Sequence, residues 1–158
     1  CAREPALALC SFDMLGEGAR SDQQARHYLD GYASAIARIA EADARDLAGA
    51  GGDPHSRSSI SIKLSALDPC YSLRQREGVH RRLIPRALEL ARLAASRNLA
   101  MTIDAEEAER LEISLEVIGA LARDRATAGW QGLGLAVQAY GRRALPLVEW
   151  VMTLAASE

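Results

Sequence analysis

Three polar residues of this chain are of types that could together bind a small charged molecule. Lys63 lies in ISIKLSALDP, residues 60–69, and is the only lysine, because the other 18 of the 19 basic residues are arginine. An ammonium group on a buried strand is costly unless a partner compensates its charge. Asp104, in TIDAEE, and Gln138, in GLAVQAY, add a carboxylate and an amide. The three groups could bind a small zwitterion or the polar edge of a ring.

Each of these residues also has an explanation that needs no ligand. Lys63 and Asp104 could form a structural ion pair, and Asp104 and Glu107 have the spacing of a capping box at the start of a helix. Gln138 could merely satisfy a neighbouring backbone group. Glu17, in DMLGEGAR, is a further carboxylate in a loop, where it could simply be solvated. The elements that position these residues decide between the interpretations.

Four short apolar runs alternate with longer segments of helical periodicity. The runs predict parallel strands near 6–13, 59–65, 99–104 and 133–139, apolar on both faces as in a sheet covered by helices. Apolar residues three and four apart predict helices at 21–47, 73–98, 106–124 and 144–156, with Ser21 or Asp22 as the first N-cap. The pattern is therefore α/β, with each strand followed by a helix on the same side of the sheet.

Two architectures fit four consecutive βα units: an open doubly wound sheet and part of a (βα)8 TIM-type barrel. The first βα turn lacks GxGxxG, and no GxxxxGK[ST] occurs in the chain, which weakens the nucleotide-binding open sheet. A barrel places its chemistry at the carboxyl ends of its strands, where Glu17, Lys63, Asp104 and Gln138 all lie. The sequence therefore favours the barrel.

Composition excludes several classes of protein. The chain has 158 residues, 49% of them hydrophobic, and a formal charge of -2, so no nucleic-acid partner is predicted. No apolar segment is long enough to span a membrane, and a cytoplasmic location is expected. Cys1, Cys10 and Cys70 are odd in number and are expected as free thiols, and the three histidines have no metal-ligand spacing. No metal site is predicted.

Four motifs, SFDMLGEGAR, ISIKLSAL, TIDAEEAERLEISLEVI and GLGLAVQAYGRRALPLVEW, resemble the proline dehydrogenase domain of the bifunctional proline-utilisation flavoenzymes. The resemblance implies a (βα)8 barrel that holds FAD and oxidises L-proline to Δ1-pyrroline-5-carboxylate, on the route from proline to glutamate. It also implies a quinone acceptor at the inner face of the membrane, a separate aldehyde dehydrogenase domain in the same polypeptide, and a parent enzyme that could be a homo-oligomer.

The resemblance assigns roles to individual residues. Lys63 and Asp104 match catalytic residues that hold the substrate, with Lys63 on the proline carboxylate. Gln138, with Ala136 beside it, matches the flavin-contacting position, and Glu17 matches a carboxylate that forms a gating ion pair with an arginine. Where the family usually has ALHPRY, this chain has ALDPCY, which places Asp68 and Cys70 at the His and Arg positions.

Residues 1–158 are accordingly expected to be a partial barrel domain with about four of its eight βα units, functional in its parent and inactive alone. One alternative is a non-catalytic half-barrel remnant that acts as an interaction module. Another is a barrel enzyme that forms a Schiff base through its lone lysine.

Overall fold

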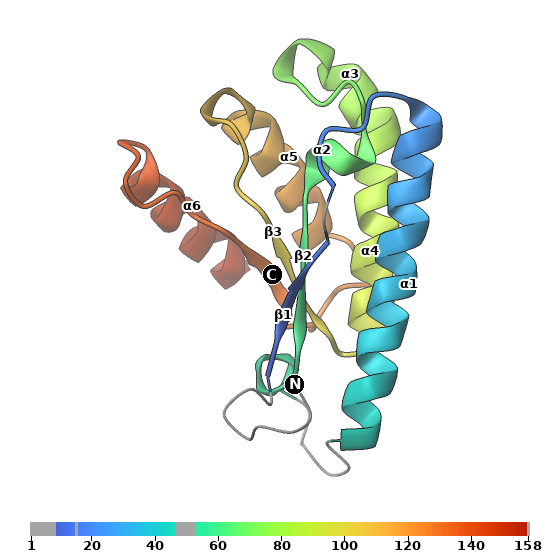
Figure 1. The fold of residues 1–158 in the computed structure, drawn as a ribbon. Helices are drawn as coiled ribbons and strands as arrows, with labels where there is room; N and C mark the ends of the chain where they lie inside the picture. The colour runs from blue at the N-terminus through green and yellow to red at the C-terminus, as the bar shows by residue number, and fades with distance from the viewer. Residues whose placement is uncertain (1–8, 15, 47–52, 158) are drawn as a thin grey trace.

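The computed structural model describes residues 9–14, 16–46 and 53–157, in which four parallel strands form one sheet. The strands are β1 (Ser11–Asp13), β2 (Ser59–Ile62), β3 (Ala100–Ile103) and β4 (Leu133–Leu135), and they lie side by side in the order of the sequence (Figure 1). The predicted parallel order is confirmed. The strands are shorter than predicted, and residues 6–8 of the first lie outside the described residues.

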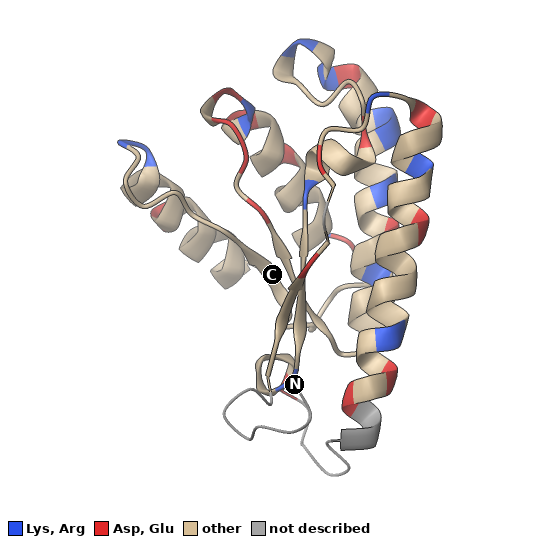
Figure 2. Ribbon diagram, viewed as in Figure 1, with Lys and Arg blue, Asp and Glu red and all other residues tan. Residues whose placement is uncertain are grey.

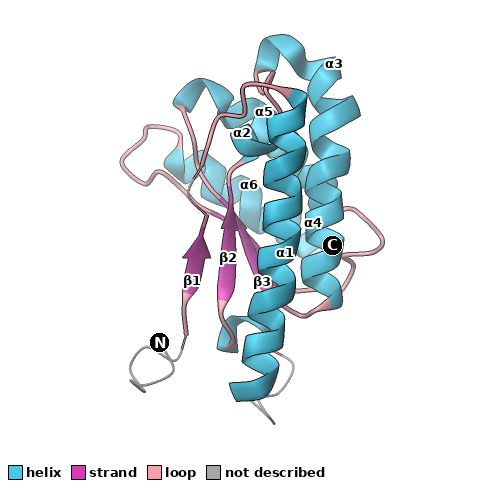
Figure 3. Cartoon of the chain, turned by 45° about the vertical axis from the view of Figure 1, so that its right-hand side comes forward, coloured by secondary structure: helices cyan, strands magenta, loops and turns pink. Residues whose placement is uncertain are grey.

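Four long helices follow the strands in turn. They are α1 (Asp22–Asp46), α4 (Ile84–Ser96), α5 (Leu111–Ala122) and α6 (Ala144–Ser157). Helix α1 packs beside α4, α4 beside α5 and α5 beside α6, so the helices form a layer in the order of the strands. Figure 3 shows α1 and α4 side by side next to the strands. The described residues thus form four consecutive βα units, with the strands and the helices in sequence order.

Shorter helical segments lie in the connections. They are η2 (Pro54–Ser56), α2 (Leu64–Leu67), η3 (Leu73–Gln75), α3 (Arg76–Gly78), η4 (Val79–Leu83) and η5 (Ala108–Arg110). The helix predicted at 73–98 is divided, and its segment η4 is a π-helical turn that precedes Pro85. Because proline has no N–H to donate to the carbonyl four residues earlier, the regular α-helical bonding cannot run through this position.

The core lies between the helix layer and one face of the sheet. Ile60 and Ile62 of β2 are fully buried, whereas Ser59 and Ser61 on the other face are half-buried. Tyr32 and Ile36 of α1 are also fully buried in this core, as the helical periodicity predicts. The expectation that the strands are apolar and covered on both faces is wrong, since small polar residues alternate with the apolar ones in SISI.

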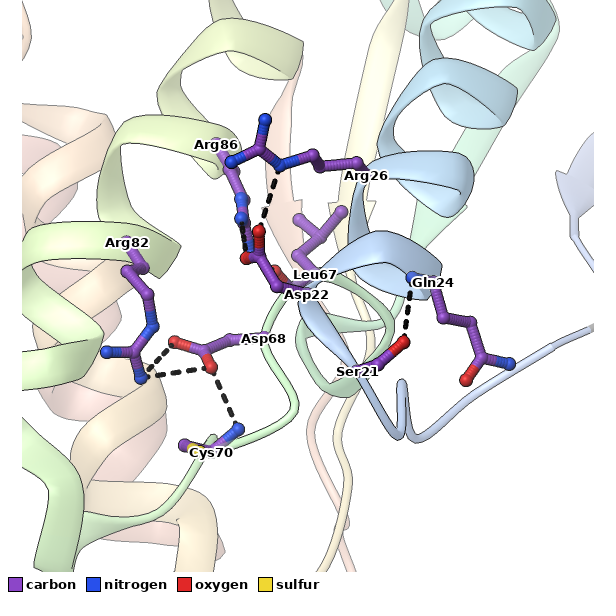
Figure 4. A network of polar contacts seen from close by, with 9 residues as sticks. All are labelled: Ser21, Asp22, Gln24, Arg26, Leu67, Asp68, Cys70, Arg82 and Arg86. Atoms are coloured by element: carbon purple, nitrogen blue, oxygen red, sulfur yellow. Dashed lines mark hydrogen bonds and ion pairs between the residues drawn. The ribbon is translucent and has the colours of Figure 1, made fainter.

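Charged side chains hold the start of α1 and the short helix α2 against the start of α4 (Figure 4). Arg86 donates to the carbonyl oxygen of Leu67 at 2.7 Å and also contacts the carboxylate of Asp22. Helix α1 begins at a cap in which the hydroxyl oxygen of Ser21 accepts from the N–H of Gln24 at 3.1 Å. Of the two predicted caps, Ser21 is therefore confirmed.

Asp68, at a position where the chain departs from the family pattern, lies in the same network. Its carboxylate accepts from the N–H of Cys70 at 2.8 Å and lies 3.2 Å from a guanidinium nitrogen of Arg82. The Asp68 side chain is completely buried. This part of the chain accommodates Asp68 as a buried ion pair that ends α2.

None of the helices in the described part of the chain is long and apolar enough to cross a membrane. Residues 9–14, 16–46 and 53–157 also contain no group of three or more histidine, cysteine or acidic side chains arranged to hold a metal ion.

Candidate functional site

The register of the sheet places the polar residues of the strand ends on one face. Asp13 is paired with Ser61, which is paired with Thr102, and Thr102 with Gly134. Two positions further along each strand come Lys63 after Ser61, Asp104 after Thr102 and Ala136 after Gly134. Because residues two apart in a strand lie on the same face, these three residues share the face of the paired ones. The ladder continues to this point, because the N–H of Asp104 donates to the carbonyl of Ile62 at 3.0 Å and that of Ala136 to Ile103 at 2.9 Å.

The ammonium of Lys63 lies between two carboxylates. Its nitrogen is 2.7 Å from Oδ1 and 2.8 Å from Oδ2 of Asp13, and 2.7 Å from Oδ2 of Asp104. The Lys63 side chain is 17% exposed, that of Asp104 21% and that of Asp13 58%. Burial alone lowers the pKa of Lys63, but the hydrogen bonds to Asp104 and Asp13 outweigh it and raise this pKa above its ordinary value.

The backbone around Lys63 is fixed by buried partners. Its N–H donates to the hydroxyl of Tyr32 at 3.2 Å, and burial raises the pKa of that phenol. The next turn is held by Ser65, whose N–H donates to Glu106 at 2.9 Å and whose hydroxyl oxygen accepts from the N–H of Gly18 at 3.0 Å. Loops after three different strands therefore meet at α2.

A small pocket of about 50 Å³ adjoins this ion cluster. Asp104, Ala136 and Gln138 contribute to its wall, together with Tyr71 and Arg110. The guanidinium of Arg110 lies 5.2 Å from the centre of the Tyr71 ring, a cation–π distance. Gln138 donates from Nε2 to the carbonyl oxygen of Glu106 at 3.0 Å, which leaves its amide oxygen as an acceptor.

The structure thus brings together four of the five residues singled out from the sequence. Lys63 contacts Asp104, and Asp104 shares the pocket with Ala136 and Gln138. The predicted ion pair between Lys63 and Asp104 and the predicted convergence at the strand ends are both present. Glu17 is exposed and makes no ion pair with any residue that the structure describes, so its role as a gate stays a prediction.

The cluster has three further neighbours. The sequence indicates Asp13 as a polar residue at the end of the first strand, whereas Glu106 and Arg110 were missed. Asp13 ends the first apolar run, and its pairing with Ser61 places it beside Lys63. Glu106 and Arg110 are four residues apart and form an ion pair of 3.0 Å. The spacing of four residues could have predicted the ion pair between Glu106 and Arg110. The contact of Asp13 with Lys63 depends instead on the register between strands.

Acidic residues are concentrated in the loop that follows β3, whereas the loop that follows β4 carries two arginines, Arg142 and Arg143 (Figure 2). The histidines lie elsewhere: His27 is exposed on α1, His55 contacts the carbonyl of Gln131 at 2.9 Å, and His80 contacts Glu116. Cys10 is half-buried and Cys70 is exposed, and Cys1 lies outside the described residues.

A parallel sheet with an outer helix layer, and a charged cluster at the carboxyl ends of its strands, define a chain of the βα-barrel class. Comparison with known proteins agrees with this class and identifies one family within it. The model of the family "Proline dehydrogenase" matches residues 2–158, and the chain belongs to that family.

Related proteins place this segment within much longer chains. The bifunctional protein PutA of Salmonella typhimurium is 40% identical over 145 residues, which cover 92% of this chain and 10% of that protein. A crystal structure of a variant of PutA from Bradyrhizobium japonicum has a TM-score of 0.85 and 47% identity over 93% of this chain and 14% of that one. A PutA structure with proline bound in remote sites has a TM-score of 0.86 and 47% identity, over 94% of this chain and 15% of that one.

Proposed function

We propose that this chain is part of an FAD-dependent proline dehydrogenase, an oxidoreductase that converts L-proline to Δ1-pyrroline-5-carboxylate. The parent would be a bifunctional enzyme with an aldehyde dehydrogenase domain, on the route from proline to glutamate. Membership of the proline dehydrogenase family supports this function, as do the PutA relatives, of which this chain spans about a tenth. The observation that carries the proposal is the contact of Lys63 with Asp104 at the end of the sheet.

The charges of this cluster suit a zwitterionic amino acid. The ammonium of Lys63 would bind the substrate carboxylate, and the carboxylate of Asp104, 2.7 Å away, would lie close to the cationic ring nitrogen. Two opposite charges at this spacing orient a small zwitterion as well as bind it. A lysine provides a compact point charge here, whereas the longer, planar guanidinium of arginine would extend into the space of the substrate ring.

The residues at the end of β4 fit a flavin ring. Ala136 is exposed and small, and Gln138 offers an amide oxygen beside the pocket, a combination that suits a planar ring with a polar edge. When bound, FAD supplies the two-electron acceptor for the hydride that leaves the proline ring. Ala136 and Gln138 would contact that ring, while Lys63 and Asp104 orient the substrate.

The domain would comprise about four of eight βα units in residues 1–158, with the rest of the barrel supplied by the parent polypeptide. A quinone would accept the electrons at the inner face of the membrane, with the enzyme otherwise cytoplasmic. Glu17 would form its gating ion pair with an arginine. The isolated chain would lack most of the flavin site and would be inactive.

Absorbance and dye reduction test this proposal on two proteins. The 158-residue chain should purify colourless, while a protein extended by four further βα units should be yellow and should reduce a dye when L-proline is added. A yellow and active 158-residue chain would refute the partial-barrel account. A colourless extended protein, inactive with proline after added FAD, would refute the proposed activity.

A second candidate function, an interaction module, has one observation in its favour. Leu145 and Met152, on one side of α6, are 69% and 67% exposed, which is unusual for large apolar residues. A module of this kind would associate with a partner and show no flavin-dependent activity in any extended form. The same absorbance experiment therefore separates it from the leading proposal.

A further inference from the structure

The ammonium of Lys63 is held between the carboxylates of Asp13 and Asp104 in this conformation. An ammonium group has three N–H donors, and its nitrogen makes three contacts of 2.7, 2.8 and 2.7 Å with oxygens of Asp13 and Asp104. A substrate carboxylate can therefore contact Lys63 through both oxygens, as Asp13 does, only if Asp13 or Asp104 gives up its place.

The two aspartates differ in how firmly they are held. Asp104 is 21% exposed, and its N–H continues the ladder between β2 and β3. Asp13 is 58% exposed and ends β1, an outer strand of three residues that are all exposed. Since Asp13 is the more exposed of the two, its carboxylate can turn away from Lys63 at a lower cost than that of Asp104, and Asp13 is the partner that can leave.

We propose that Asp13 is an intramolecular placeholder for the carboxylate of the ligand. In the absence of ligand, its two oxygens occupy the position on Lys63 that a ligand carboxylate takes. A bound ligand displaces them, so that one bidentate carboxylate replaces another while Lys63 keeps its contact with Asp104. The proposal rests on the proposed function for the choice of L-proline as ligand.

This arrangement determines the class of ligand. Lys63, Asp13 and Asp104 together carry one net negative charge, so a simple anion is repelled as well as blocked. A zwitterion has an advantage, because its carboxylate takes the place of Asp13 on Lys63 while its cation faces Asp104 and the displaced Asp13. Asp13 would thus make the site select amino acids over monocarboxylates, which identifies it as a specificity-determining residue.

The lone lysine makes the displacement measurable. Lysine labelled with ¹³C at the ε carbon gives one NMR signal, from Lys63. This signal can be followed in the wild-type chain, in Asp13→Asn and in the control Asp30→Asn. The control changes an exposed carboxylate on α1. Cyclopentanecarboxylate is the probe, because it has a five-membered ring and a carboxylate like those of L-proline but lacks the cationic ring nitrogen. The dissociation constant of cyclopentanecarboxylate should fall on the order of tenfold in Asp13→Asn and should be unchanged in Asp30→Asn.

L-Proline gives the second half of the test. Asp13→Asn removes a carboxylate that faces the cation of the zwitterion. The affinity of this variant for L-proline should therefore rise less than its affinity for cyclopentanecarboxylate. Its selectivity for L-proline over cyclopentanecarboxylate should fall. Circular dichroism verifies the fold of each variant, and Asp13→Ser replaces Asp13→Asn if the latter is not folded. Unchanged or weaker binding of cyclopentanecarboxylate to a folded Asp13 variant would overturn the placeholder.

The two proposals fail in different ways. If Asp13→Asn tightens the binding of cyclopentanecarboxylate but the extended protein does not oxidise proline, the placeholder stands and the proposed function falls. If the extended protein oxidises proline and Asp13→Asn leaves binding of cyclopentanecarboxylate unchanged, the proposed function stands and the placeholder falls.

Discussion

The ammonium nitrogen of Lys63 lies 2.7 Å from Oδ2 of Asp104, although 41 positions separate the two residues in the sequence. A structural ion pair and a substrate site are not exclusive here, because the pair lies at the carboxyl end of the sheet rather than under the helices. The pair compensates the charge of a lysine that is only 17% exposed. The same geometry places both groups at the end of the sheet, where a ligand that displaces Asp13 can reach them.

The first prediction concerns the charge at this position. Lys63→Met leaves Asp13 and Asp104 facing each other without a cation, and we expect a loss of stability on the order of 1–2 kcal/mol, since solvent reaches both carboxylates. Lys63→Arg keeps the charge and should lose less, yet it should bind L-proline more weakly, because a guanidinium fills more space. Urea denaturation and NMR titration measure the two effects. Equal stability of Lys63→Met and wild type would contradict this account.

The second prediction tests the buried carboxylate of Asp68. Arg82→Gln leaves Asp68 charged and without its cation, and we expect a loss of roughly 2–4 kcal/mol. Asp68→Asn keeps an acceptor for the N–H of Cys70 and should lose less, because the released Arg82 is 35% exposed and can be solvated. Urea denaturation tests this difference in stability between the two variants. A larger loss of stability in Asp68→Asn than in Arg82→Gln would show that an uncompensated buried charge is not the cause of the loss.

Much of the fold follows from local patterns in the sequence. The apolar runs predict the four parallel strands, although not that only one face of β2 is buried, and the spacing of Tyr32 and Ile36 predicts the buried side of α1. Even the division of the helix predicted at 73–98 has a visible cause, since Pro85 interrupts its hydrogen bonding. These features depend on neighbours in the chain, which a sequence displays directly.

The contacts of the site depend on distant parts of the chain and were less predictable. Lys63 and Asp104 could be paired because each follows a clear apolar run. The position of Asp13 at the end of the first strand could be expected, but its contact with Lys63 could not, because that contact depends on the register of a strand of three residues against β2. Such a register is set by packing over the whole sheet, and a shift of one residue would turn Asp13 to the opposite face.

The third prediction concerns stability in acid. The hydrogen bond from His80 and the contact with Arg76 hold the pKa of Glu116 below its ordinary value of 4.5. A depressed carboxyl pKa stabilises the fold above the unfolded-state value, and this contribution is lost as the pH falls through the folded-state value. Glu116→Gln should therefore show a shallower loss of stability than wild type in urea denaturation between about pH 6 and about pH 3.

The matched control for this experiment is Glu89→Gln, which changes an exposed carboxylate on α4. It should retain the acid dependence of the wild-type chain. Identical acid dependence in wild type and Glu116→Gln would mean that Glu116 does not link α5 to the segments that carry Arg76 and His80.

The last prediction concerns association of the isolated chain. Strands β1 and β4 each have one neighbouring strand in the described sheet, and unpaired strand edges promote association. Leu145 and Met152 add an exposed apolar side of α6, opposite the buried Leu147 and Leu154. We therefore expect the chain to self-associate through α6.

The variant Leu145→Glu/Met152→Glu should weaken that association, on the order of tenfold in its dissociation constant, because two exposed apolar side chains that the contact would cover become charged. Substitutions at exposed positions cost little stability, so the fold should be retained. Thr153→Glu, which adds a charge on another side of the same helix, should leave association unchanged. Sedimentation over a range of concentrations measures all three proteins, and unaltered association of the double variant would place the contact at the strand edges instead.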